Sequence, residues 1–504
     1  MKKILVFLAA SVLMIGNAYA EIAWNGETIT PWTDGDGTAA SPYIISSPAH
    51  LAYLATQVNA GNSYAGKFFQ QEEDFNMGYK SWTSIGGSSA ATPAPTPFEG
   101  IYNGNSRYIR NLDGNHLFGL INNATLQNLT LIADTVVSSS MVNETNGTCV
   151  ITNCTNTAPR ESKDFYYGAI VNEAKGQSLT LTWCNNYGAI TVYGSADYSL
   201  PYIAVGGIVG ISYAQELNMT RCSNNANIIG SAQATPAVGG LVGGVIEGVL
   251  AMNQCSSTGN IMGDAVEMGS EYGIGHLVGL VEELGSATIL RSYAKGLAYN
   301  YLVGNCRDNN VIAKGCYVID DANNWESAYF MPKANTYNCY YANTVNTGVL
   351  DWESNFSWST FSSYCFHSCT VDIKMGTYVS TGEIKSQAFL SRINGDEEEF
   401  FVMDLDNINS GYPILKWQEG LRYAITATCD ANRGTVKGGG YYAEGNTVTL
   451  TATPKTGCTF VGWSDGNSDN PRTVTVSADS TFIAQFTKSQ YTIYVNQDCT
   501  GSIE

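Results

Sequence analysis

The chain has 504 residues, with 52 glycines, 31 tyrosines and a formal net charge of −19. So acidic a surface disfavours nucleic acid and anionic membranes as partners. Charged residues make up only 14% of the chain, and a composition rich in Gly and Tyr favours turns and strands over helices.

Residues 1–20 have the pattern of a secretory signal peptide. Lys2-Lys3 precedes an apolar run over Ile4–Ile15, and Ala18–Ala20 supplies small residues before a cleavage point at Glu21. The apolar run is too short to span a bilayer. We therefore expect export, with the mature protein at the cell surface or outside the cell and not spanning the membrane.

Residues 21–64 are expected to hold a strand at Pro42–Ile45 and then a helix over Pro48–Ala60. Ser47 is the predicted N-cap, proline occupies the first helical position, and Gly61 lies just past the end. The apolar residues of this helix fall on one face at helical spacing. We expect the helix to cover the end of a repetitive domain, because a bare end would expose unpaired strand edges.

A short phrase of four residues recurs in the middle of the chain. Each copy contains an isoleucine or leucine followed directly by a valine. Its copies are Gly168-Ala-Ile-Val171, Gly207-Ile-Val-Gly210, Gly240-Leu-Val-Gly243, His276-Leu-Val-Gly279 and Tyr301-Leu-Val-Gly304. Repetition of this kind is typical of a solenoid, in which each coil buries its apolar face against its neighbours. We predict that residues 65–375 form one continuous stack of β-coils.

A cysteine follows the valine of the phrase by the same interval in four of the copies. These cysteines are Cys184, Cys222, Cys255 and Cys316. Parallel strands lie about 4.8 Å apart, which is slightly too far for a relaxed disulfide between neighbouring coils. We predict an aligned interior stack of mostly reduced thiols, with cross-coil disulfides as the alternative. The odd total of 13 cysteines leaves at least one thiol free or paired outside the chain.

Residues 376–420 are predicted to cap the other end of the solenoid. Ser380–Asn394 reads as a helix, with Ser380 and Glu383 at the spacing of a capping box, and Gly411–Trp417 is expected to complete the cap.

Residues 421–487 alternate apolar and polar side chains between Gly-rich turns, which predicts a small all-β domain. The expected strands include Thr447–Thr453, Thr473–Val476 and Thr481–Phe486. Residues 488–504 look like the start of a second, truncated copy.

Two family resemblances follow from these residues. The recurring phrase, Trp32–Thr38, Phe98–Gly100, Asn128–Leu131 and Gly411–Trp417 together resemble bacterial GLUG-motif proteins. That resemblance implies a right-handed parallel β-helix of the kind found in exported adhesin-like proteins. Tyr423–Phe486 is similar to the divergent internalin-type B repeat, which implies a stalk or spacer module of a bacterial surface protein. Neither family supplies catalytic residues, so function follows only by association.

Candidate catalytic residues are few. Hydrolysis of a polysaccharide would need two carboxylates that converge across a cleft, and Asp320-Asp321 is the adjacent aspartate pair. Zinc proteolysis needs a His-Glu-x-x-His helix, and no such motif joins the four scattered histidines. These histidines are His50, His116, His276 and His367. We predict that the chain has no catalytic residues and is not an enzyme.

Two patterns resemble metal sites. Asp34-Gly-Asp36-Gly resembles the opening of a calcium loop, but the bidentate acid that should follow is missing, and a simple turn is the alternative. Cys365, His367 and Cys369 could share one strand face as soft ligands, and inward packing is the alternative. We predict no metal and no cofactor.

Tyrosine and tryptophan side chains are candidates for a carbohydrate-stacking surface, although internal packing would use them equally well. The tryptophan candidates are Trp82, Trp325, Trp352 and Trp358. The predicted function is that of an adhesin-like protein whose β-helix presents a binding face to a glycan or a surface protein. A polysaccharide-degrading β-helix enzyme and a structural spacer are the alternatives.

Overall fold

The structure is a computed structural model of the whole chain. It describes residues 23–87, 95–193, 202–232, 235–265, 273–296, 302–306, 311–320, 334–337, 339–343, 377–395, 399–405, 407–419, 422–443, 447–478 and 480–488. These residues divide into two compact units, one that ends at Met403 and one that begins at Asp404.

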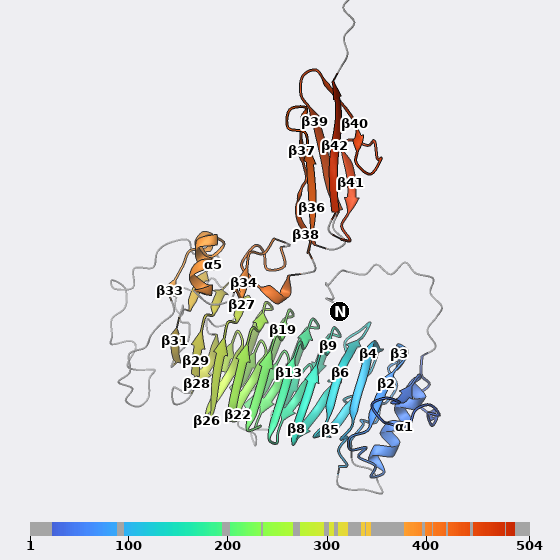
Figure 1. Cartoon of the computed structure of the whole chain (residues 1–504). Coiled ribbons are helices and arrows are strands. Elements are labelled where there is room, and N and C mark those ends of the chain that lie inside the picture. The colour runs from blue at the N-terminus through green and yellow to red at the C-terminus, as the bar shows by residue number, and fades with distance from the viewer. Residues whose placement is uncertain are drawn as a thin grey trace, which may run out of the picture. The chain divides into compact units, whose positions relative to one another are not determined.

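The first unit is a parallel β-helix, which confirms the predicted fold class (Figure 1). Parallel pairing joins 25 strands into one sheet system that winds from coil to coil. The strands are β1 Tyr43–Ile45, β2 Phe68–Gln71, β3 Phe75–Asn76, β4 Ile101–Arg110, β5 Phe118–Asn122, β6 Thr125–Ile132, β7 Val142–Asn146, β8 Thr148–Thr152, β9 Thr155–Asn156, β12 Val171–Ala174, β13 Ser178–Thr182, β14 Asn185–Asn186, β17 Val209–Ser212, β18 Glu216–Thr220, β19 Ser223–Asn224, β22 Val242–Asn253, β23 Ser256–Ser257, β26 Val278–Leu290, β27 Tyr293–Gly296, β28 Val303–Cys306, β29 Val311–Lys314, β30 Tyr317–Asp320, β31 Ala334–Tyr337, β32 Tyr340–Asn343 and β33 Thr377–Tyr378. The first rung forms at β1, which pairs with β2, and therefore before residue 65.

Helix α1 (Pro48–Asn59) lies beside the first coils, as predicted. The Ser47 hydroxyl accepts the His50 N–H at 3.3 Å, which confirms the N-cap. Leu51, Leu54 and Val58 of this helix are fully buried in the same core as the coils. The helix therefore adds apolar contact to the first rung as an end cap would.

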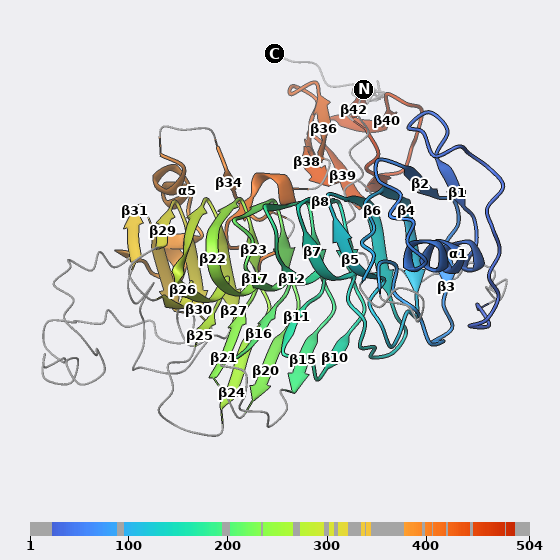
Figure 2. The same ribbon diagram turned by 90° about the horizontal axis from the view of Figure 1, so that it is seen from below.

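A wing of two additional sheets projects from the middle coils, and the sequence did not reveal it (Figure 2). One sheet contains β10 Arg160–Ser162, β15 Ile190–Tyr193, β20 Ile228–Ala232 and β24 Ile261–Ala265. The other contains β11 Tyr166–Gly168, β16 Tyr202–Gly206, β21 Thr235–Gly239 and β25 Gly273–Gly275. The wing has its own apolar core, which includes Ile190, Val205 and Ile228.

The wing explains why the coils differ in length. Phe118 pairs with Val142 and Val278 pairs with Val303, so these plain coils take 24 and 25 residues. Winged coils are longer: Val171 pairs with Val209, which is 38 residues later. The repeat is therefore one coil of nearly constant size with an insertion of variable length.

The two apolar residues of the repeated phrase point into the main core, and the glycine after them lies against the wing. A Cβ on Gly243 would come within 2.5 Å of Val205 N, and one on Gly304 within 2.3 Å of Ile274 N. The first copy has Asn172 at this position. Because β11 is an edge strand of its sheet, no strand of that sheet precedes Asn172. Glycine is required only where a wing strand of the previous coil crosses.

The predicted cysteine stack is confirmed in its register. Cys184, Cys222 and Cys255 stand directly before paired positions of β14, β19 and β23, and Cys316 holds the same place before β30. Cys154 and Cys339 extend the column, and Ser292 interrupts it. The fourth copy therefore places serine, and not Tyr293, on the cysteine rung. All of these cysteines are buried, and Cys184, Cys222, Cys255 and Cys316 form no disulfide, while their redox state in the cell stays a prediction.

A second interior column is built from asparagine. The side-chain Nδ2 of Asn156 donates to Asn186 Oδ1 at 2.7 Å, and Asn186 Nδ2 donates to Asn224 Oδ1 at 2.8 Å. The buried Arg160 guanidinium closes one end by donating to Asn156 Oδ1 at 2.7 Å. Ser257 and Ala294 continue the register, so the column loses its amides toward the plain coils.

The predicted helix over Ser380–Asn394 is two helices, α4 (Thr381–Ile384) and α5 (Gln387–Asn394). The break occurs because Ser386 caps a new helix by accepting the Phe389 N–H at 3.2 Å. Ser380 accepts the Glu383 N–H as expected, at 3.1 Å. Glu383 instead pairs with Arg392, so its side chain leaves the predicted capping box incomplete.

The second unit begins with a short segment and then forms a small all-β domain, as predicted. The opening segment holds β35 Ile414–Leu415 and the 3-10 helix Lys416–Gln418, so Gly411–Trp417 belongs to this unit. The domain strands are β36 Arg422–Cys429, β37 Gly434–Lys437, β38 Gly440–Ala443, β39 Thr447–Pro454, β40 Cys458–Trp463, β41 Arg472–Thr475 and β42 Ser480–Lys488. They form one sheet in the order β38-β36-β42-β40 and another in the order β37-β39-β41. Leu450 and Trp463 are buried in their shared core.

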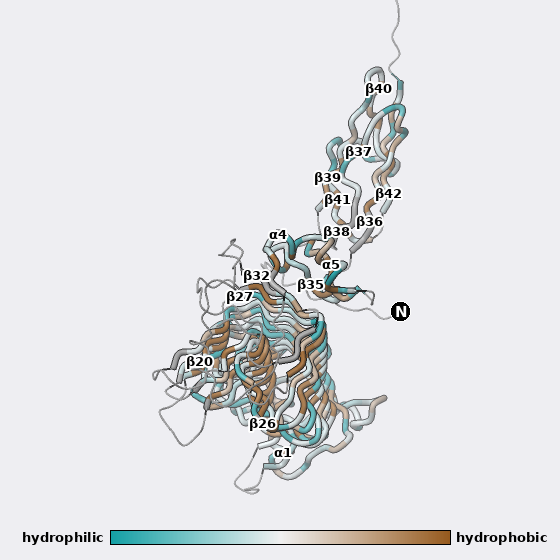
Figure 3. The backbone as a smooth tube through the Cα atoms, turned by 90° about the vertical axis from the view of Figure 1, so that its left-hand side faces the viewer, coloured by the Kyte–Doolittle hydropathy of each residue, from teal (hydrophilic) through white to brown (hydrophobic). Residues whose placement is uncertain are grey.

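Hydropathy follows this layout, with apolar residues repeating along the stacked coils (Figure 3). Among the described residues, no helix is both long and apolar enough to cross a membrane.

Candidate binding face

Several candidates from the sequence lie outside the described residues. Asp320 ends β30, while Asp321 is not described. The same holds for Cys365, His367 and Cys369 and for three of the tryptophans. These tryptophans are Trp325, Trp352 and Trp358. The paired-acid and Cys-His-Cys hypotheses therefore stay open.

The Asp34-Gly-Asp36-Gly segment is a tight turn. Asp36 Oδ1 accepts the Thr38 N–H at 2.9 Å, and this hydrogen bond lowers the pKa of the Asp36 carboxyl. Gly35 and Gly37 hold φ values of 90° and 76°, which L side chains rarely adopt. The Asp36 carboxylate is thus engaged by its own backbone. The described residues contain no group of three or more His, Cys, Asp or Glu side chains placed to hold a metal ion.

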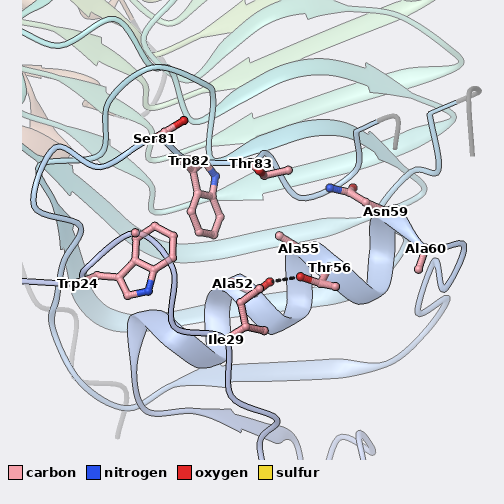
Figure 4. Close-up of a pocket in the computed structure, with 11 residues that line it drawn as sticks. Trp24, Ile29, Ala52, Ala55, Thr56, Asn59, Ala60, Ser81, Trp82 and Thr83 are labelled. Carbon is pink, nitrogen blue, oxygen red and sulfur yellow. Dashed lines mark hydrogen bonds between the residues drawn. The ribbon is translucent and has the colours of Figure 1, made fainter. Parts of the chain in front are cut away.

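Trp82 is not available for stacking on a ligand, because it is only 1% exposed. Its Nε1 donates to Leu117 O at 3.3 Å, and its ring meets Trp24 edge to face at a centroid distance of 5.8 Å. Trp82 therefore serves the core beneath α1 (Figure 4).

A hollow of about 430 Å³ opens between α1, the segment around Trp24 and the turn at Trp82 (Figure 4). The side-chain amide of Asn59, which lines this hollow, already has hydrogen-bond partners. Asn59 Oδ1 accepts the N–H groups of Gly86 and Gly87, and Asn59 Nδ2 donates to Ser84 O. The hydroxyl of Thr56 donates to Ala52 O within the helix. The polar groups here serve to join the cap to the coils.

A serine and a histidine meet inside the β-helix, where Ser140 Oγ lies 2.7 Å from His116 Nδ1. Ser140 is fully buried, and its own backbone N–H also donates to Nδ1 at 3.1 Å. Burial lowers the pKa of His116. The pair lacks the access to solvent that a nucleophile needs, so it satisfies interior polar groups.

One outer surface combines open aromatic rings with ordered amides. It follows β9, β14, β19 and β23, the turns after them and the wing strand β15, and we call it the amide face. It comprises Thr157, Tyr187, Tyr193, Asn225, Asn227 and Thr258. Tyr187 and Tyr193 are 38% and 48% exposed. Strand alternation causes this display, because Asn186 and Val192 on the same coil point inward and are buried.

Side chains of the amide face bind one another across the coils. Asn225 Nδ2 donates to Ser223 Oγ at 3.2 Å, and Asn225 Oδ1 accepts the Thr258 hydroxyl at 3.0 Å. Asn227 Oδ1 accepts the Asn260 N–H at 3.0 Å. Within the described part of the chain, Asn227 Nδ2 has no hydrogen-bond partner. The network fixes the amides and leaves a donor directed at solvent.

The amide face is free of formal charge over three coils, and its charged borders are Glu161, which pairs with Thr191, and Lys295, which follows Thr258 in register. Residues 185–193, 223–231 and 256–263 include no Asp, Glu, Lys or Arg, although the chain carries 44 acidic and 25 basic residues. The surface therefore offers hydroxyl, amide and aromatic groups without a strong field.

Farther along the solenoid the same column is covered by the chain itself. Asn185, Ser223 and Ser256 are followed in register by Tyr293, Tyr317 and Tyr340. Tyr293 and Tyr317 stack at 5.1 Å, and Phe389 of α5 and Phe401 of β34 (Phe401–Val402) pack on Tyr317. The column is thus aromatic where α5 and β34 pack on it and polar on the earlier coils, where Ser223 and Ser256 are buried as well.

The sequence analysis did not predict that the residues of the amide face lie together on one surface. The predicted tryptophan is buried, whereas the exposed rings are Tyr187 and Tyr193. An alternation of polar and apolar residues over Asn185–Tyr193 was the available signal.

Known proteins resemble parts of this chain. No curated protein matches it. A solved structure from Bacteroides ovatus, described as "a putative immunoglobulin A1 protease", is similar over 76% of this chain and 95% of its own, with 16% identity and a TM-score of 0.35. A likeness of that size bears on neither fold nor activity. Residues 423–490 match the family model of the divergent InlB B-repeat domain, a module typical of bacterial surface proteins.

Proposed function

We propose that this chain is an exported bacterial adhesin-like protein that acts at the cell surface or outside the cell. In this proposal the β-helix presents the amide face to a glycan or protein ligand, and the B-repeat domain belongs to a β-rich stalk. The observation that carries it is an ordered, uncharged and open patch on a rigid scaffold. Such preorganisation lowers the entropy that binding must overcome.

Three further features support the proposal. The B-repeat match at residues 423–490 links the chain to surface proteins. The pattern of residues 1–20 is that of a signal for export. The glycine phrase resembles the GLUG motif of adhesin-like proteins.

We also propose that the chain has no catalytic activity. The Ser140 hydroxyl beside His116 is fully buried, and Asn59 is engaged by backbone groups in the hollow beneath α1. A polysaccharide-degrading enzyme would instead need a cluster of carboxylates open to one lateral face.

The test uses the mature full-length protein on arrays of glycans and of host and bacterial surface proteins, beside a polysaccharide-degradation assay. We expect saturable binding without release of sugar. Sugar release that disappears when a clustered carboxylate is mutated would replace the adhesin with the enzyme. Absence of binding to every array would favour a structural spacer.

A further inference from the structure

We infer that the ligand of the amide face is a neutral, linear glycan that lies across successive coils, an inference that rests on the proposed binding function. The first argument is the chemistry of the exposed groups. Tyr187 and Tyr193 offer flat rings with polar edges, and Asn227 Nδ2 offers a donor. Sugars present both apolar faces and hydroxyl acceptors, so the two kinds of group are complementary to them.

The absence of charge narrows the class of ligand. Acidic glycans and nucleic acids are held by Arg and Lys, and residues 185–193, 223–231 and 256–263 include neither. The nearest basic side chain in register is Lys295, which follows Thr258 on the next coil, beyond the uncharged coils. Arg221 lies over the Trp183 ring at 5.1 Å and donates to Gln254 at 3.1 Å. A neutral ligand therefore fits this surface better than an anionic one.

The repeat geometry favours a polymer over a single sugar. Polar positions recur on successive coils, about 4.8 Å apart along the solenoid, although Ala189 and Pro159 hold the Asn227 position on the two preceding coils. Asn225 and Thr258 occupy one such column on successive coils, and Asn227 and Asn260 occupy another. Groups spaced regularly along one axis match a ligand whose own units repeat.

A protein partner fits the surface less well. Binding hot spots in protein interfaces are aromatic or Arg anchors in well-packed pockets, with water excluded around them. The amide face is rich in small polar groups that already bind one another, which leaves few pockets for such an anchor. The part of the same column suited to apolar contact, at Tyr317 and Tyr340, is covered by Phe389 of α5.

The decisive variant is Asn227→Asp in the full-length mature protein. It keeps Oδ1 as the acceptor for the Asn260 N–H and replaces the outward donor with a charged oxygen. Asn62→Asp is the matched control, because it adds the same charge at an exposed asparagine after α1. Tyr187→Ala tests the ring, and circular dichroism melts verify that each variant folds.

Neutral polysaccharides should be retained by the wild type with an affinity that does not change between low and high salt. Asn227→Asp should bind at least about tenfold more weakly, since a donor that faces the ligand becomes an acceptor. Asn62→Asp should bind as the wild type does.

Four results would overturn the inference. Equal binding by Asn227→Asp and Asn62→Asp would remove the amide face as the site. Affinity confined to acidic glycans and lost in high salt would replace the neutral ligand with a charged one. Binding only to proteins would leave the proposed function intact and exclude the glycan, whereas binding to nothing would remove both proposals.

Discussion

Winged and plain coils of the β-helix use the same main strands but need different residues at their corners. Where a wing strand of the preceding coil passes at close range, a glycine follows the recurring valine, as at Gly243 and Gly279. Asn172 occupies that place where no strand of the second wing sheet precedes it. The glycine of the repeated phrase therefore marks the wing insertion, while the two apolar residues mark the coil.

The interior columns differ between the same two classes of coil. Asparagine fills the column at Asn156, Asn186 and Asn224 in winged coils, and Ala294 takes its place in a plain coil. His276 stands where winged coils have Gly207 and Gly240. A Cβ on Gly240 would lie 2.2 Å from Ser257 Oγ, and the coil that begins with His276 has the smaller Ala294 at the position of Ser257.

The largest expected loss of stability comes from substituting a glycine that lies against the wing. Gly243→Ala should lower the free energy of unfolding by at least about 3 kcal/mol, because its Cβ would meet backbone atoms 2.4 Å and 2.5 Å away. Urea denaturation with the two variants below as controls measures the difference.

Two control variants distinguish the clash with a wing strand from the general effect of replacing a residue by alanine. Asn172→Ala occupies the same column without a wing strand to meet, and should cost only about 1 kcal/mol for its lost hydrogen bonds. Gly382→Ala in α4 has open space around its Cβ and should be neutral or slightly stabilising. An equal loss for Gly243→Ala and Asn172→Ala would contradict the comparison.

His276 makes the plain coil at Val278 sensitive to acid. It is fully buried, neither ring nitrogen has a hydrogen-bond partner in the described part of the chain, and burial lowers its pKa from 6.5 to about 4. Above pH 6.5 the group is neutral in both states. Between 6.5 and 4 only the unfolded chain binds the proton, so stability falls as the pH falls, by about 3 kcal/mol at most.

The measurement is the unfolding free energy of the wild type and of His276→Gly against pH. The variant should lose part of the slope between pH 6.5 and 4, and His116, whose pKa is also lowered, should account for some of the remainder. Parallel pH profiles for the two proteins would show that His276 is not the titrating group.

Breaking the asparagine column should have a smaller effect. Asn186→Ala should cost about 2 kcal/mol, because it removes the hydrogen bonds that Asn186 makes with the Gly188 carbonyl, Asn156 Nδ2 and Asn224 Oδ1 inside the core. Ser257→Ala should cost well under 1 kcal/mol, since the Asn224 contact there is long at 3.4 Å. Thermal melts of the two variants side by side test the order, and a larger loss for Ser257→Ala would reverse it.

The last prediction is that the buried thiols of the folded core do not react with an alkylating reagent. Burial raises the pKa of Cys154 to about 12 and raises that of Cys184 well above its usual value, so both should resist alkylation until the protein unfolds. Cys429 and Cys458 are half-buried and should react first. Mass spectrometry of alkylated, non-reduced protein decides this, and a Cys184–Cys222 disulfide in most molecules would refute the reduced stack.

The residues of the amide face could not be predicted without knowing which side of each strand faces solvent. Sequence reasoning selected Trp82 as a possible stacking ring, and the structure buries it against Trp24. The open rings, Tyr187 and Tyr193, belong to a coil whose wing gave no recognisable signal. Ring identity alone could not separate these roles, because burial depends on what packs beyond the strand.

The sequence by itself determined the coil. A valine and a cysteine at a fixed interval specify a strand, a corner and a second strand, and that local spacing is preserved however the coils are connected. Only the tertiary structure decided the wing, the serine at position 292 in the thiol column and the closure of the asparagine column by Arg160. These features depend on pairing between residues 24 to 38 positions apart, and insertions of variable length hide such pairings from any fixed period.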